Sequence, residues 1–213
     1  MKRVLIIGAG DLGQQIAHYV SESTEHTIVG YVDDWANAGD IRRGYPVLGC
    51  VEDTEMLYHQ DVFDELLIGV GYKHFDARKQ LFDRYKSVIP FATYIHQNCV
   101  VDRTAKIGKG VVMLSNNVIS MDAYIGDNVF MYSGSRIGNG SIVNSHCIFS
   151  LSVLTGGYSE IEEQCFCGMG STIIDSVRVE KNNFIGARTN VVKNITGTNG
   201  VWAGNPARLI RRR

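Results

Sequence analysis

The first candidate functional residues form a glycine-rich turn near the start of the chain. Residues 4–7 form a short apolar run, residues 8–13 have the sequence GAGDLG, and residues 14–20 have the composition of a helix. This order predicts a strand, a tight turn and a helix N-terminus. Such a turn lets backbone approach a phosphate closely, and the positive end of the helix attracts anions. The turn therefore favours phosphate or nucleotide binding over a turn that only packs a helix on a sheet.

Two carboxylates follow the second predicted strand. Residues 27–32 form that strand, and it ends at Asp33 and Asp34, which could accept hydrogen bonds from a ribose or sugar hydroxyl. An acid about twenty residues past the last glycine is typical of a dinucleotide-binding site. An NAD-dependent oxidoreductase is nonetheless the least favoured function, because the predicted sheet ends by residues 67–70 and leaves no second half for the nicotinamide.

A third polar loop is expected at the same edge of this sheet. Residues 69–73 have the sequence GVGYK, and they lie between the last predicted strand and a helix over residues 75–85. The carboxyl ends of parallel strands meet at one edge, so this loop should lie near the glycine turn. Tyr72 and Lys73 are therefore candidate substrate-binding residues. Lys73 could meet a phosphate or be an ordinary exposed lysine.

The rest of the chain has a six-residue period that starts at Val101 and continues for sixteen repeats. An apolar residue recurs every six positions, with Thr155 as the exception, and a small or slim residue follows four positions later. Short strands that turn a corner every six residues build a triangular β-solenoid of about five coils, stacked roughly 4.8 Å apart. We therefore predict a small Rossmann-like parallel α/β domain over residues 1–90, then an all-β left-handed parallel β-helix over residues 91–213. An inert rod would have the same period.

Composition argues against several classes of partner. A net charge of -1 and a pI near 6.6 give no indication of nucleic acid or an anionic membrane. No stretch is long enough to span a bilayer and no signal core precedes the first strand, so a cytoplasmic protein is expected. The five cysteines lack zinc-ligand spacing with histidine, so no metal site is predicted. Cys165 and Cys167 are expected to be small buried packing residues.

The combination of the two domains resembles the sugar O-acyltransferase family that includes the bacterial PglD and NeuD-type acetyltransferases. The resemblance covers essentially the whole chain and is carried by the hexads and by residues 8–13, 32–34, 92–96 and 201–207. It implies a homotrimer whose solenoids pack side by side, with acetyl-CoA in the groove between two of them. It also implies that the small domain holds a nucleotide-linked amino sugar destined for a surface glycan, glycoprotein or lipopolysaccharide.

The resemblance also implies which positions meet the two substrates. The contacts to the nucleotide-linked sugar are expected at the glycine turn and at the end of the second strand: Gly10, Asp11, Leu12, Asp33 and Asp34. The acetyl-CoA groove is expected to include Ile148, Met169 and Ala187, mainly through their backbone.

One hexad departs from the family pattern. Members usually carry a histidine followed by an acidic residue in the hexad that here spans residues 137–142, where the histidine is the general base and the acid tunes its pKa. This chain has Asn139 and Gly140 at those positions. Neither side chain can take a proton at neutral pH.

Three functions are compatible with this departure. In the leading one, the protein is an acetyl-CoA-dependent N-acetyltransferase without a protein base, because a sugar amine is already a nucleophile and Asn139 could orient it. In the second, His146, expected at an outward position of its hexad, is the base of a sugar O-acetyltransferase; a surface or groove-lining histidine is its plainer role. In the third, the protein binds a sugar nucleotide without catalysis.

Overall fold

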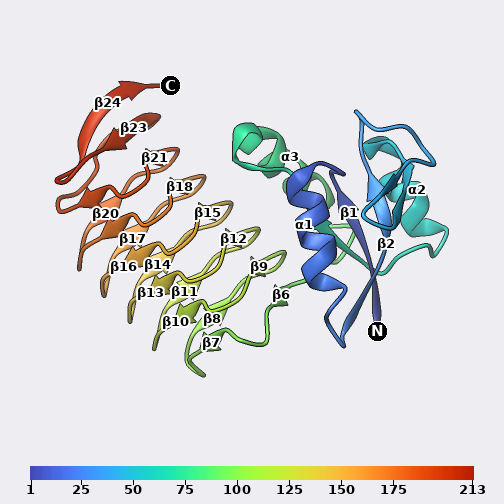
Figure 1. Cartoon of the computed structure of the whole chain (residues 1–213), viewed down its shortest axis with the longest axis horizontal. Coiled ribbons are helices and arrows are strands. Elements are labelled where there is room, and N and C mark those ends of the chain that lie inside the picture. Colours follow the sequence, from blue (N-terminus) through green and yellow to red (C-terminus); the bar gives the residue numbers. More distant parts are fainter. The chain divides into compact units, whose positions relative to one another are not determined.

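The computed structural model describes all 213 residues, and the chain folds into two compact units, Met1–Tyr94 and Ile95–Arg213 (Figure 1). The change between them lies slightly later than the expected division after residue 90. No helix is long and apolar enough to cross a membrane.

The first unit is a five-stranded sheet with three helices. Its strand order is β3-β4-β2-β1-β5, with β3 antiparallel and the other pairings parallel. The strands are β1 (Lys2–Ile7), β2 (His26–Val32), β3 (Ile41–Arg42), β4 (Tyr45–Gly49) and β5 (Glu65–Ile68). The helices are α1 (Asp11–Val20), α2 (Thr54–His59) and α3 (Phe75–Tyr85), with the 3-10 turns η1 (Val51–Asp53) and η2 (Tyr72–His74). The predicted parallel α/β class is confirmed, whereas β3, β4 and α2 were not predicted.

The core of this unit explains why residues 4–7 of its central strand, β1, are all apolar. Residues 4–7 of β1 are completely buried, as expected for a parallel strand covered on both faces. On α3, the buried residues Phe75, Arg78, Phe82 and Tyr85 recur every three or four positions. One helix face therefore carries an arginine within an apolar stripe.

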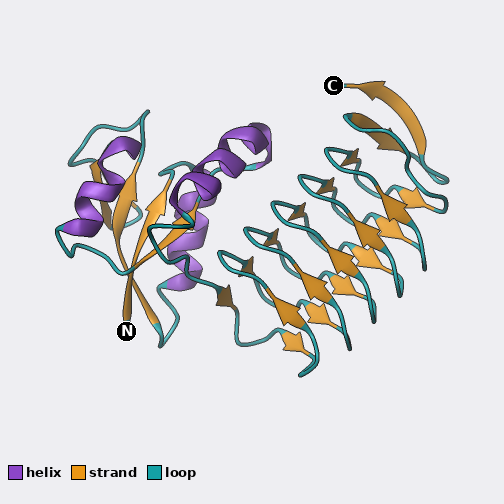
Figure 2. Cartoon of the chain, turned by 180° about the vertical axis from the view of Figure 1, so that it is seen from behind, coloured by secondary structure: helices purple, strands orange, loops and turns teal.

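The second unit is a left-handed parallel β-helix with three faces, which confirms the predicted solenoid (Figure 2). The strands from β7 to β22 pair in parallel with their counterparts one coil away, eighteen residues along the chain, whereas the last strand, β24, pairs antiparallel with β23. Face 1 comprises β7 (Val100–Val101), β10 (Val118–Ile119), β13 (Arg136–Ile137), β16 (Leu154–Thr155), β19 (Thr172–Ile173) and β22 (Asn190–Val191). Face 2 comprises β8 (Lys106–Ile107), β11 (Tyr124–Ile125), β14 (Ile142–Val143), β17 (Glu160–Ile161) and β20 (Arg178–Val179). Face 3 comprises β6 (Tyr94–Ile95), β9 (Val112–Met113), β12 (Phe130–Met131), β15 (Ile148–Phe149), β18 (Phe166–Cys167), β21 (Phe184–Ile185), β23 (Gly200–Ala203) and β24 (Arg208–Arg212).

The hexad positions form the core of the solenoid. From Met113 to Val191 the periodic residues point inward and are buried, as are the smaller residues four positions later. Cys165 and Cys167 are among them and completely buried, as predicted. The exception, Thr155, is also buried, and its hydroxyl accepts a hydrogen bond from the Gly138 N–H at 3.1 Å. A threonine thus replaces an apolar residue where a backbone donor needs a partner.

Candidate functional site

The glycine turn after β1 is a point of very close backbone approach. A Cβ on Gly13 would lie 1.8 Å from the Gly8 carbonyl oxygen, and a Cβ on Gly69 would lie 2.6 Å from the Gly13 Cα. Gly8 itself has a φ of +101°, which favours glycine. The three glycines therefore let the start of α1 lie directly against the ends of β1 and β5.

The N-terminus of α1 is open at the predicted phosphate-binding residues. Gly10 is the N-cap residue, in an extended conformation, and no side chain caps the helix. Gly10 and Asp11 are exposed, and Leu12 is buried at the base of the turn. The first N–H groups of a helix need external acceptors, so this end of a ten-residue helix can bind an anion.

Asp33 and Asp34 hold the edge of the sheet together. One oxygen of Asp33 accepts from the Ala9 N–H at 2.7 Å, and the other accepts from the N–H groups of Trp35 at 2.7 Å and Ala36 at 3.0 Å. One oxygen of Asp34 accepts from the Val51 N–H at 2.9 Å. A carboxylate has about four acceptor positions. Asp33 therefore has little capacity left for a ribose hydroxyl, and its main contribution is to fix the loop after β2 to the glycine turn.

Arg78 performs a similar task on the other side of the turn. Its guanidinium is buried and donates to the carbonyl oxygens of Ile68 at 2.7 Å and Val70 at 3.0 Å. Burial lowers the pKa of Arg78 to about 9, so it stays charged at neutral pH. The loop after β5 that Arg78 fixes leads to Tyr72 and Lys73, which are both exposed. The sequence prediction missed Arg78, although its place in the apolar stripe of α3 is a detectable signal.

The sheet order brings these loops together as predicted. β1 lies between β2 and β5, so the glycine turn lies between the loop of Asp33 and Asp34 and the loop of Tyr72 and Lys73. The carboxyl edge of this unit is therefore a row of three loops with the uncapped N-terminus of α1 in its middle.

Asn139 and Gly140 lie in the turn from face 1 to face 2, where Asn139 is exposed. Gly140 has a φ of +63°, and a Cβ there would lie 2.7 Å from two ring atoms of Tyr158, one coil later. The Tyr158 N–H donates to the Asn139 carbonyl oxygen at 2.9 Å. The Tyr158 ring therefore occupies part of the volume that a side chain at position 140 would need.

His146 is buried, contrary to the expectation of a surface histidine. It lies in the turn from face 2 to face 3 and is 3% exposed. The Asn128 side-chain amide, one coil earlier, is 3.0 Å from its Nδ1. An amide NH2 group can only donate, so Nδ1 accepts this bond and is not available to take a proton. The side chain of His146 therefore contacts the same turn of the preceding coil.

The three positions expected at the acetyl-CoA groove have different environments. Met169 and Ala187 are exposed and stacked in the turn from face 3 to face 1, where the Arg188 N–H donates to the Met169 carbonyl oxygen at 2.8 Å. Ile148 is 1% exposed, and its neighbours one coil before and one coil after on face 3, Phe130 and Phe166, are also buried. The side chain of Ile148 therefore cannot line an open groove within one chain.

The structure does not bring the candidate site residues of the solenoid together within one chain. Asn139, His146 and Met169 lie in three different corners of the triangular coil. Of these corners, those of Asn139 and Met169 border face 1. A site that uses both must extend across that face or include a corner of another chain.

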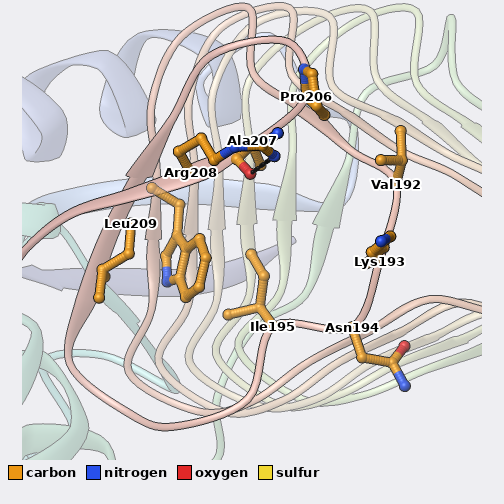
Figure 3. A pocket seen from close by; sticks show the side chains of 9 residues that line it. Val192, Lys193, Asn194, Ile195, Pro206, Ala207, Arg208 and Leu209 are labelled. Carbon is orange, nitrogen blue, oxygen red and sulfur yellow. Dashed lines mark hydrogen bonds between the residues drawn. The ribbon is translucent and has the colours of Figure 1, made fainter.

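A pocket of about 350 Å³ lies at the end of the solenoid (Figure 3). Its wall includes Trp202, Ile195 and Leu209, with Lys193 and Arg208 also in the lining. None of the predicted site residues lines it. No group of three or more His, Cys, Asp or Glu side chains is placed to hold a metal ion.

Comparison with known proteins supports the family resemblance. Residues 3–85 match the family described as the PglD N-terminal domain. A stretch of 53 residues is 43% identical to gamma carbonic anhydrase 1, mitochondrial, of Arabidopsis thaliana. That stretch is 24% of this chain and spans 19% of the length of the carbonic anhydrase.

The whole chain shares its fold with solved acetyltransferases. One is a histidine-to-asparagine mutant of perosamine N-acetyltransferase from Caulobacter crescentus in complex with CoA and GDP-perosamine, with a TM-score of 0.89 and 24% identity over 98% of this chain and 97% of that chain. Another is the acetyltransferase domain of PglB from Neisseria gonorrhoeae in complex with acetyl coenzyme A, with a TM-score of 0.88 and 22% identity over 98% of this chain and 99% of that chain. The folds of both domains of this chain thus occur together in each of these solved structures.

Proposed function

We propose that this protein, whose first unit matches the PglD N-terminal domain, is an acetyl-CoA-dependent N-acetyltransferase that acts on a nucleotide-linked amino sugar for surface glycan synthesis. One observation carries the proposal: an open helix N-terminus at a glycine turn and a hexapeptide solenoid occur together in a fold that is shared, over nearly the whole chain, with an enzyme bound to CoA and GDP-perosamine.

The chemistry at Asn139 favours an amine acceptor. A neutral sugar amine attacks the thioester carbonyl carbon, the C–S bond breaks, CoA leaves as a thiolate, and the extra amine proton passes to the thiolate or to water. No side chain needs to remove a proton before the attack, so positioning by the Asn139 amide is sufficient. The perosamine N-acetyltransferase structure with a histidine-to-asparagine substitution still holds CoA and GDP-perosamine, which supports binding of the coenzyme and of the acceptor sugar nucleotide without that histidine.

A homotrimer would complete the site. Asn139 and the exposed pair Met169 and Ala187 lie in separate corners of one solenoid, so a groove between two solenoids can join corners of different chains. The solenoid also exposes apolar side chains that association would cover: Met121, Tyr124, Ile142, Leu154, Tyr158 and Met169.

O-acetylation with His146 as the base is less well supported, because His146 is buried and its Nδ1 accepts a hydrogen bond. A sugar-nucleotide-binding protein without activity is the second candidate. The observation that favours it is the absence of a histidine or carboxylate at positions 139 and 140.

Release of free CoA thiol tests the proposal directly. The protein is given acetyl-CoA and a panel of nucleotide-linked sugars, some with a free amine and some with hydroxyls only. We expect CoA release with amines alone, and a marked loss with Asn139→Ala while His146→Asn retains activity. Binding of acetyl-CoA and of the sugars without any CoA release would support the silent binding protein, and release with hydroxyl acceptors would support O-acetylation.

A further inference from the structure

Trp35 is a tryptophan on the surface with a fixed backbone. Its side chain is 98% exposed, the highest value among the large apolar residues of the chain. Its N–H donates to Asp33 at 2.7 Å, and the following N–H, of Ala36, donates to the same oxygen at 3.0 Å. The structure therefore presents a large aromatic face to solvent from a loop that is held in place.

The carboxylate that holds Trp35 also holds the glycine turn. The second oxygen of Asp33 accepts from the Ala9 N–H at 2.7 Å, and Ala9 immediately precedes Gly10, the N-cap of α1. The backbone at Trp35 is thus tied, through one side chain, to the helix end that can bind a phosphate.

Sheet order gives a direction to any ligand anchored at the glycine turn. β1 lies between β2 and β5, so a diphosphate at the start of α1 has the loop of Trp35 on one side and the loop of Tyr72 and Lys73 on the other. In sheets of this type the nucleoside extends from the phosphates towards the end of the second strand. The base therefore reaches the loop after β2, where the exposed indole is.

We infer that Trp35 is the surface on which the base of the nucleotide-linked substrate stacks, and that the sugar lies on the opposite side of the glycine turn, towards Tyr72 and Lys73. The nature of the ligand in this inference rests on the proposed function. Every base has a π-face, so stacking on an indole adds affinity with little selection among bases. Discrimination among bases must then come from groups other than Trp35.

Calorimetric titration of the wild-type protein, Trp35→Ala and Trp35→Phe tests the inference, with GDP, UDP and inorganic pyrophosphate as probes. We expect Trp35→Ala to weaken GDP and UDP binding by about tenfold or more, whereas Trp35→Phe stays within about threefold of the wild type, because a phenyl ring still stacks. Pyrophosphate binding should be the same in all three proteins. Equal GDP binding by Trp35→Ala and the wild type, or equal losses for GDP and pyrophosphate, would overturn the inference.

Fluorescence gives a second measurement that does not depend on removing Trp35. The chain has two tryptophans, and the other, Trp202, is partly buried with its Nε1 donating to Asn183 Oδ1 at 3.1 Å. In a Trp202→Phe protein all indole emission comes from Trp35. GDP should quench that emission and pyrophosphate should not. An emission unchanged by GDP at concentrations that saturate the calorimetric signal would contradict stacking.

Kinetics separate this inference from the proposed function. With a nucleotide-linked amino sugar as acceptor, Trp35→Ala should raise KM about tenfold and leave kcat nearly unchanged, because the base lies away from the reacting amine. If the wild type binds GDP on Trp35 but releases no CoA with any acceptor, the transferase proposal fails and the inference stands. If the wild type releases CoA and Trp35→Ala has an unchanged KM, the inference fails and the transferase proposal stands.

Discussion

The edge of the first unit and the corner of the solenoid that bears Asn139 differ in how their polar residues are held. At the sheet edge, Asp33 accepts three backbone hydrogen bonds and Arg78 donates to two carbonyl oxygens. At the solenoid corner, Asn139 is exposed and is followed by a glycine. The first arrangement fixes its loops through buried or multiply bonded polar groups, whereas the second contains no group that can take a proton at neutral pH. Under the proposed function, recognition of the ligand and the chemistry on it thus place unequal demands on the fold.

The largest effect is expected at the glycine turn. Gly13→Ala places a Cβ 1.8 Å from a backbone oxygen, which α1 and β1 can avoid only by moving apart. We expect a loss of unfolding free energy of about 3 kcal/mol in the first unit, measured by urea denaturation. Gly10→Ala is the matched control, because a Cβ at Gly10 meets nothing within 4 Å. Equal stability of the two variants would show that the close approach is unimportant.

Arg78→Met tests whether the loop after β5 is held by the buried guanidinium. The substitution removes the donor for the carbonyl oxygens of Ile68 and Val70, and we expect a destabilisation of about 2 kcal/mol. The KM for the nucleotide-linked sugar should also rise, because Tyr72 and Lys73 follow this loop. Lys79→Met, at a partly exposed site on the same helix, should change both values little. An unchanged KM in Arg78→Met would show that the loop after β5 does not contribute to binding of the nucleotide-linked sugar.

A side chain added at position 140 is expected to destabilise the protein less than the two changes above, because the Tyr158 ring is exposed and can rotate away. Gly140→Glu should destabilise the solenoid by about 1 to 2 kcal/mol, since the new side chain displaces the ring and the backbone of a non-glycine residue must adopt a positive φ. In a Tyr158→Ala background the same change should cost less. A double-mutant cycle measures the difference. Additive effects would mean that Tyr158 does not fill the space above Gly140.

Adding Asn139→His to the Gly140→Glu variants, with and without Tyr158→Ala, tests whether a general base can be restored. We expect a new rise of the rate with pH near the ordinary pKa of histidine, about 6.5, and measurable turnover of hydroxyl acceptors. The rate profile against pH with amine and hydroxyl sugars is the measurement. An unchanged profile would show that position 139 is too far from the acceptor in this protein.

The smallest effect is expected at Thr155. Thr155→Val keeps the shape of the side chain but leaves the Gly138 N–H without its acceptor, and we expect a loss of about 1 kcal/mol. Ile173→Val, one coil later in the same inward column, removes a methylene without touching a hydrogen bond. Thermal unfolding of both variants distinguishes a polar from a packing contribution.

Periodic features were predictable from the sequence and individual contacts were not. The hexads define the solenoid because each apolar position faces the same core, and residues 8–13 define the first turn because the glycines allow close backbone approach. β3 and β4 were missed, because residues 41–49 contain Pro46 and pair across a short hairpin without a regular apolar alternation. The burial of His146 was missed for a different reason. It depends on Asn128, eighteen residues earlier, and a linear reading of one hexad does not include that neighbour.

The eighteen-residue register makes substitutions in the corners of this solenoid depend on one another. A side chain in a corner lies against its counterparts one coil above and one coil below, so Gly140 and Tyr158 form a vertical pair although they are far apart along the chain. A larger residue at position 140 needs space that a smaller residue at position 158 would supply. A corner redesigned on this scaffold therefore needs substitutions at two adjacent levels together.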